Sequence, residues 1–149
     1  MIRANNNKII LALGVVLVVI ILFFIAVKLF SSDKQIVINN KVFKIELAQD
    51  ASQQARGLSG RLNLAENRGM LFVMANKSRP SFWMKDMFFP LDIIWISNDK
   101  VVDITNNAPI VTDDYYITYA PKEPVDYVLE INAGLAEKYG IKIGDTVKF

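Results

Sequence analysis

The residues best suited to chemistry lie between positions 80 and 96, in the stretch PSFWMKDMFFPLDIIWI. Lys85, Asp86 and Asp92 interrupt a run of aromatic and aliphatic side chains there. An amine beside carboxylates could bind a polar ligand, support acid–base catalysis or form an ion pair within a core. Aromatic and Met residues beside a polar pair resemble a ligand cleft, although such clusters are more often plain core.

The chain contains no Cys and no His. These absences exclude disulfides, Fe–S clusters, Cys- or His-ligated metals, Cys nucleophiles and Ser-His-Asp catalysis. Any reaction must therefore use carboxylates, Lys, Tyr, hydroxyl groups or a hard cation held by oxygen atoms. We expect no cofactor.

Asp92 opens the apolar segment LDIIWI, in which both faces of a strand would be hydrophobic. A buried carboxylate there needs a cation or several hydrogen-bond donors. Arg56, Arg61 and Lys85 are the available cations. We favour an ion pair with Arg56 that ties the first short helix to the sheet, and a ligand-binding or catalytic role is the alternative.

Lys85 and Asp86 are the candidate functional residues at the edge of a cleft. Trp83 is expected to pack inside, and Lys85 is expected to reach solvent. Glu130, in the segment YVLEI, could join the Arg56 and Asp92 cluster or face solvent. Two weaker candidates lie elsewhere. The adjacent residues Asp113 and Asp114 could help to hold Ca²⁺, and the neighbouring Tyr and Pro residues could stack on a sugar or peptide.

Residues 9–27 form an uncharged stretch of nineteen residues. As a helix they would extend roughly 28 Å, close to the thickness of a bilayer core, and no small-residue cleavage site follows. We therefore expect an uncleaved transmembrane anchor that places the chain at the cytoplasmic membrane, with the globular domain outside. The expected organisation is a basic tail (1–8), an anchor (9–30), a linker (31–35) and a β-rich domain (36–149).

The charge is evenly balanced beyond the anchor. Arg3, Lys8 and Lys28 flank the apolar stretch, and the rest of the chain carries the other 14 of the 17 basic residues beside 15 acidic ones. A nearly neutral domain without a basic stripe argues against binding to nucleic acid.

Alternating hydrophobicity and turn signals predict six to eight short strands and two short helices. Asn39-Asn40 is a hairpin signal because Asn tolerates positive φ, and Asp50 is a candidate helix N-cap. The expected fold is mainly β with some α+β character: a compact antiparallel β-sandwich or barrel-like domain with two short helices, preceded by a single transmembrane helix. Strands are expected near 36–38, 41–48, 69–74, 91–96, 100–111 and 127–131, with a final strand after a turn at Gly144-Asp145, and helices near 50–56 and 133–140.

Five sequence blocks occur in an order that resembles the domain of unknown function 192 family. They are ARGLSGR (55–61), GMLFVM (69–74), FWMKDMFFPLDIIWI (82–96), YVLEI (127–131) with Gly134, and YGIKIGD (139–145). The resemblance implies a compact β-rich domain with no established activity. One block departs from the family pattern, because Asp86 and Met87 stand where the family usually has Asn and Thr.

These observations together favour an envelope protein whose β-domain binds a ligand or partner, such as another envelope protein, a glycan or a lipid head group. The alternative is a carboxylate-dependent hydrolase or transferase with its site near Lys85 and Asp92. An enzyme should contain a carboxylate with a perturbed pKa in an accessible cleft, next to a nucleophile or water site. A binding module should instead expose an aromatic patch.

Overall fold

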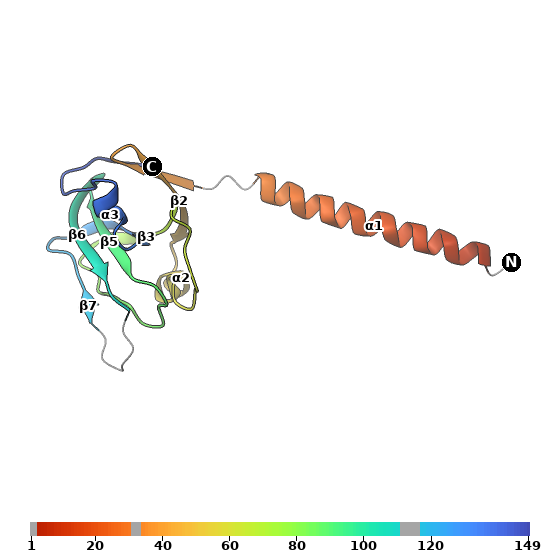
Figure 1. Ribbon diagram of the computed structural model, residues 1–149, viewed down its shortest axis with the longest axis horizontal. Helices are drawn as coiled ribbons and strands as arrows, with labels where there is room; N and C mark the ends of the chain where they lie inside the picture. The colour runs from red at the N-terminus through yellow and green to blue at the C-terminus, as the bar shows by residue number, and fades with distance from the viewer. Residues whose placement is uncertain (1–2, 31–33, 111–116) are drawn as a thin grey trace. The chain divides into compact units, whose positions relative to one another are not determined.

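The computed structural model describes residues 3–30, 34–110 and 117–149, and within the N-terminal helix it describes the side chains of residues 10–23. The chain divides into two compact units, Met1–Ser32 and Asp33–Phe149. The first unit contains helix α1 (Arg3–Phe30), and the second contains all the strands of the described residues (Figure 1).

The expected transmembrane anchor requires a correction. Within the described part of the chain, no helix combines the length and apolarity needed to cross a membrane. This finding contradicts the anchor predicted at residues 9–27 and the single-pass location at the cytoplasmic membrane that was inferred from it.

The second unit is built on a seven-stranded sheet with the strand order β6-β5-β8-β3-β2-β1-β9. Strands β4 and β7 form a separate two-stranded sheet. The strands are β1 (Lys34–Ile38), β2 (Lys41–Ala48), β3 (Arg68–Ser78), β4 (Phe82–Trp83), β5 (Leu91–Ser97), β6 (Lys100–Ala108), β7 (Thr118–Tyr119), β8 (Val125–Asn132) and β9 (Val147–Lys148), and the helices are α2 (Ala51–Arg56) and α3 (Leu135–Lys138).

The predicted sandwich or barrel also requires correction, because the main sheet is a curved half-barrel (Figure 1). All its pairings are antiparallel except that of β2 with β3, which is parallel. Its edge strands meet at one end only, where Lys100 bridges to Thr146 and the Val101 N–H donates to the Asp145 carbonyl oxygen over 3.0 Å. The described edges are not paired along their full length, so the sheet does not close into a barrel.

Each face of the curved sheet carries its own hydrophobic core. On one face, α3 packs through Leu135 and Ala136 against β1, β2, β5 and β8. On the other face, the segment after α2 and the turn after β4 cover Phe72, Trp95 and Val128. Because side chains alternate along a strand, neighbouring residues of β8 enter different cores, and this alternation determines which charged groups become buried.

Two predicted local signals are confirmed. Asn39 and Asn40 have φ values of 46° and 63° in the turn between the antiparallel strands β1 and β2. Asp50 is the N-cap of α2, where its side chain accepts from the Gln53 N–H over 2.8 Å while the Gln53 side chain accepts from the Asp50 N–H. This reciprocal arrangement is a capping box, which fixes where the helix begins.

Candidate functional site

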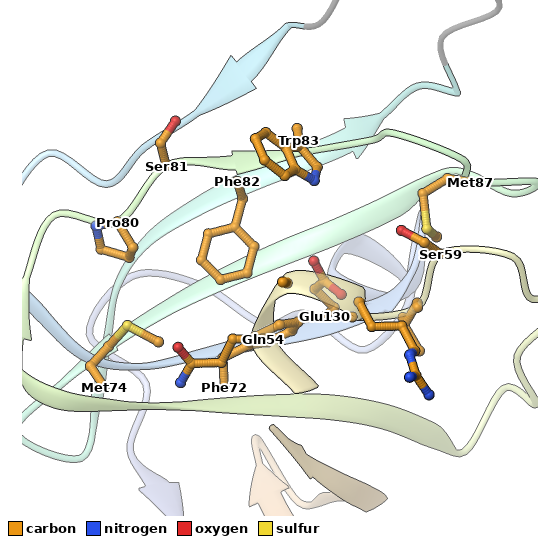
Figure 2. A pocket seen from close by; sticks show the side chains of 14 residues that line it. Gln54, Ser59, Phe72, Met74, Pro80, Ser81, Phe82, Trp83, Met87 and Glu130 are labelled. Carbon is orange, nitrogen blue, oxygen red and sulfur yellow. The ribbon is translucent and has the colours of Figure 1, made fainter. Parts of the chain in front are cut away.

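A pocket of about 260 Å³ opens on the face of the sheet that α2 and β4 cover (Figure 2). It lies between the end of α2, strands β3 and β8, and the segment around β4. Its lining residues are Gln54, Ala55, Arg56, Gly57, Leu58, Ser59, Phe72, Met74, Pro80, Ser81, Phe82, Trp83, Met87 and Glu130. The wall is therefore mainly apolar and aromatic, and it includes only two ionisable side chains.

The end of α2 is shaped by Gly57, which has a φ of 51° in the left-handed region. A Cβ atom at this position would lie 3.3 Å from the Phe72 ring, so glycine permits both the turn and the close approach of the ring. Gln54 closes the neighbouring side. Its amide nitrogen donates to the backbone carbonyl oxygens of Ala48 and Val73, at 3.3 and 2.9 Å.

Hydrogen bonds tie the segment after α2 to the turn after β4. The Ser59 hydroxyl donates to the Lys85 carbonyl oxygen over 2.9 Å, and the Gly60 N–H donates to that of Asp86 over 2.8 Å. Asp86 has a φ of 56°, so the chain reverses direction sharply at this point. These contacts hold two sides of the pocket together without using any charged side chain.

Aromatic rings form much of the pocket wall. Phe82 makes edge-to-face contacts with Phe72 and Trp95, with ring centroids 4.8 and 5.5 Å apart. Trp95 is fully buried, and its indole N–H donates to the Thr105 hydroxyl over 3.1 Å. Trp83, in contrast, is 52% exposed. The prediction that Trp83 packs inside is wrong, because alternation along β4 directs Phe82 into the core instead.

Glu130 contributes a carboxyl group to this apolar wall. The residue lies in the middle of β8, opposite Met70 of β3 and Ile93 of β5, and is only 5% exposed. Figure 2 shows its carboxyl group turned into the pocket, toward the space between Phe82 and Ser59. No other group among the described residues forms a hydrogen bond or ion pair with this carboxyl group.

Burial raises the pKa of Glu130 from 4.5 to about 8. The low-polarity surroundings disfavour the charged form, and no neighbouring donor compensates for the loss of water. At neutral pH the group is therefore mainly a neutral carboxylic acid. It can donate one hydrogen bond, or it can ionise once a suitable partner enters the pocket.

The structure buries Asp92 completely but gives it partners other than the expected arginine. The Asn107 N–H donates to Asp92 Oδ1 over 2.9 Å, and the Ala136 N–H donates to Oδ2 over 2.8 Å. Its carboxylate thus joins the end of β6 to α3. Arg56 is exposed at the pocket and, among the described residues, makes no ion pair with Asp92, so the predicted pair is wrong.

The remaining sequence candidates are dispersed. Arg61 forms a bidentate pair with Glu46, at 2.8 and 2.7 Å, outside the pocket. Lys85 and Asp86 have exposed side chains and contribute backbone carbonyl oxygens to the turn after β4. The expectation that Lys85 reaches solvent is confirmed. Of the six candidates, only Arg56 and Trp83 line the pocket that contains Glu130.

No group of three or more acidic side chains in the described part of the chain is arranged to hold a metal ion. The candidate calcium residues Asp113 and Asp114 lie outside the described residues, as do Tyr115 and Tyr116.

From the sequence alone, Glu130 could either join a charged cluster or face solvent. The available signal was a carboxylate inside an apolar strand, because an acidic side chain is seldom fully buried unless it has a partner.

Comparisons with known proteins agree with this fold. The family model of DUF192, described as "Uncharacterized ACR", matches residues 34–149. A crystal structure of a protein of unknown function from Novosphingobium aromaticivorans DSM 12444 is 36% identical, with a TM-score of 0.70 over 77% of this chain and 84% of that one. A second structure, from Sinorhizobium meliloti 1021 and described as a "putative transcription regulator", is also 36% identical, with a TM-score of 0.65 over 72% and 81% of the two chains. The search of curated proteins finds no match. The chain belongs to the DUF192 family.

Proposed function

We propose that the β-domain is a binding module for a small organic ligand, which enters the pocket between α2, β3, β4 and β8. The observation that carries the proposal is the carboxyl group of Glu130, which is buried in the pocket without a protein partner. Polar groups in protein interiors nearly always have a hydrogen-bond partner, and the carboxyl group of Glu130 can obtain one only from the pocket side. A ligand in the pocket would provide that partner.

The shape and lining of the pocket support this function. A volume of about 260 Å³ suits a ligand of a few heavy atoms, and apolar walls with a few polar groups are typical of small-molecule sites. Trp83 is half exposed beside the opening, where its ring could cover a bound ligand. This exposed ring supports binding, although the sequence-based expectation was a larger aromatic patch.

Catalysis by a carboxylate-dependent hydrolase or transferase is the second candidate. The raised pKa of Glu130 favours it, because acids and bases in active sites often have perturbed pKa values. The acid or base would then be Glu130 instead of Lys85 or Asp92. Among the described residues, however, no nucleophile forms a hydrogen bond with Glu130, and the Ser59 hydroxyl donates to a backbone carbonyl oxygen. Binding therefore fits the site better.

Two substitutions in α2 test the proposal. Ala51 and Ala55 are both exposed on this helix, but only Ala55 lines the pocket. The full-length wild type, Ala55→Trp and Ala51→Trp would be screened by thermal shift against small cations, anions and neutral compounds. Hits would then be mapped by NMR on the Gly57 amide and the Trp83 indole. We expect ligands that bind the wild type and Ala51→Trp but not Ala55→Trp, because an indole at position 55 fills the opening.

Equal binding of every hit to Ala55→Trp would place the site elsewhere and overturn the proposal. Absence of any hit across the three charge classes would do the same. Turnover of a hit, detected as a product by mass spectrometry and lost in Glu130→Gln, would replace the binding function with the catalytic one.

A further inference from the structure

Building on the proposed binding function, we propose that the pocket receives a primary ammonium group, with the Glu130 carboxylate as its counter-ion and Phe72, Phe82 and Trp83 as its walls. The ligand class is a small alkylamine, either free or as the side chain of a lysine. The unpartnered carboxyl group and the aromatic lining of the pocket both favour a cation over other small ligands.

The carboxyl group of Glu130 lacks both of the things that an ammonium group supplies. Among the described residues, no group donates a hydrogen bond to it and no cation forms an ion pair with it, and Glu130 is 5% exposed. An ammonium group offers three N–H donors and a full charge. A charge-assisted hydrogen bond between these groups is stronger than a neutral one and would give the carboxylate oxygens a partner.

The aromatic lining also suits a cation. Phe72 and Phe82 lie at the wall with ring centroids 4.8 Å apart, and Trp83 lies beside them at the opening. The faces of aromatic rings carry negative electrostatic potential and attract ammonium groups within about 6 Å. Met74 and Met87 complete a polarizable surface that can accommodate the alkyl chain.

Arg56 is the only other ionisable residue in the lining, and its position does not oppose a bound cation strongly. Its side chain is exposed, so water and salt screen its charge. Glu130 lies at the buried end of the pocket, where screening is weak. The electrostatic field within the pocket is therefore dominated by Glu130 once this group ionises.

Binding of a cation must also be coupled to release of the Glu130 proton. With a pKa of about 8, the group is mainly protonated at pH 6 and mainly ionised at pH 9. Only the ionised fraction forms the ion pair, so the apparent affinity for a cation should rise roughly 100-fold between these pH values. An alkylamine keeps its own charge over this range, because its pKa is near that of lysine, about 10.4. A neutral ligand that accepts a hydrogen bond from the protonated carboxyl group of Glu130 would instead bind more weakly as the pH rises.

Isothermal titration calorimetry with full-length protein tests the inference. The probes are n-butylammonium, 1-butanol and butanoate, which share a chain length but differ in charge, and a blocked tripeptide with a central lysine. We expect n-butylammonium to bind more tightly than the alcohol or the acid at pH 9. At pH 6, titrations in buffers of different ionisation enthalpy should reveal about one proton released per bound cation.

Glu130→Gln should weaken the binding of n-butylammonium roughly 30-fold or more and abolish its pH dependence. The exposed residue Glu123 provides the control, because Glu123→Gln should behave as the wild type. Tighter binding of the lysine tripeptide would identify a lysine side chain as the source of the ammonium group, and tighter binding of the free amine would identify a metabolite.

Equal affinities for n-butylammonium and 1-butanol, or unchanged cation binding in Glu130→Gln, would overturn the inference. So would a failure of n-butylammonium to bind at pH 9. If the alcohol or butanoate still bound in that case, and Ala55→Trp blocked this binding, the proposed binding function would remain intact. The two proposals therefore fail in distinguishable ways.

Discussion

Replacing Glu130 by Gln should make the domain more stable, increasingly so as the pH rises. The folded protein holds this carboxyl group at a pKa of about 8, whereas an unfolded chain would have it near 4.5. Between these values the folded state keeps a proton that the unfolded state has released. Because stability falls with rising pH wherever the folded state binds more protons, the wild type loses stability across this window.

The size of the effect follows from the two pKa values. Integrating the linkage from pH 5 to pH 9 gives a loss of about 4 kcal/mol in the free energy of unfolding of the wild type, relative to a variant without the titrating group. Gln has nearly the same shape as Glu and cannot ionise, so Glu130→Gln should escape this loss. Below about pH 4.5 the two proteins should be similarly stable, because the carboxyl group is protonated in both states.

Urea unfolding at pH 5, 7 and 9 measures this difference. With a typical urea dependence of about 1–3 kcal/mol per molar, the unfolding midpoints of the wild type and Glu130→Gln should diverge by roughly 1–4 M between pH 5 and pH 9. Glu123→Gln removes an exposed carboxylate and should follow the wild type within about 0.5 kcal/mol. Parallel midpoints for the wild type and Glu130→Gln over this range would refute the view that Glu130 is buried without a partner.

Three further substitutions test the geometry by chemical denaturation. Asp92→Asn should cost about 1–3 kcal/mol, because it leaves the backbone N–H of Asn107 or Ala136 without its acceptor at a fully buried side chain, whereas Arg56→Met should stay within about 0.5 kcal/mol. A double-mutant cycle of Asp92→Asn with Arg56→Met should show negligible coupling. Coupling above about 1 kcal/mol would instead support an ion pair between the two side chains. Gly57→Ala should cost about 1–2 kcal/mol, since it strains a left-handed φ and crowds a ring at 3.3 Å; a neutral result would contradict the close approach. Trp83→Ala should cost less than about 1 kcal/mol because the ring is half exposed, and a loss above 2 kcal/mol would place the ring in the core.

The sequence by itself determined the features that depend on near neighbours in the chain. Asn39-Asn40 predicts its hairpin because the conformation of a turn is a property of the residues within it. Asp50 predicts the start of α2 because its cap partner lies three residues away. Alternating apolar residues likewise predict a mainly β domain, and the ordered sequence blocks indicate its family. Part of one block, LDIIWI, correctly predicts that Asp92 is buried.

Only the tertiary structure decided which distant residues meet. The partners of Asp92 are backbone N–H groups of a remote strand end and of α3, and no local pattern distinguishes them from a nearby arginine. Glu130 becomes buried because β8 lies between β3 and β5 in the sheet, an order that alternation within one strand does not specify. Phe82 comes from the separate sheet of β4 and β7 and lies over Glu130 in the pocket (Figure 2). The pKa of Glu130 rises because the residues that surround it come from other segments, exclude most water and donate no hydrogen bond to it.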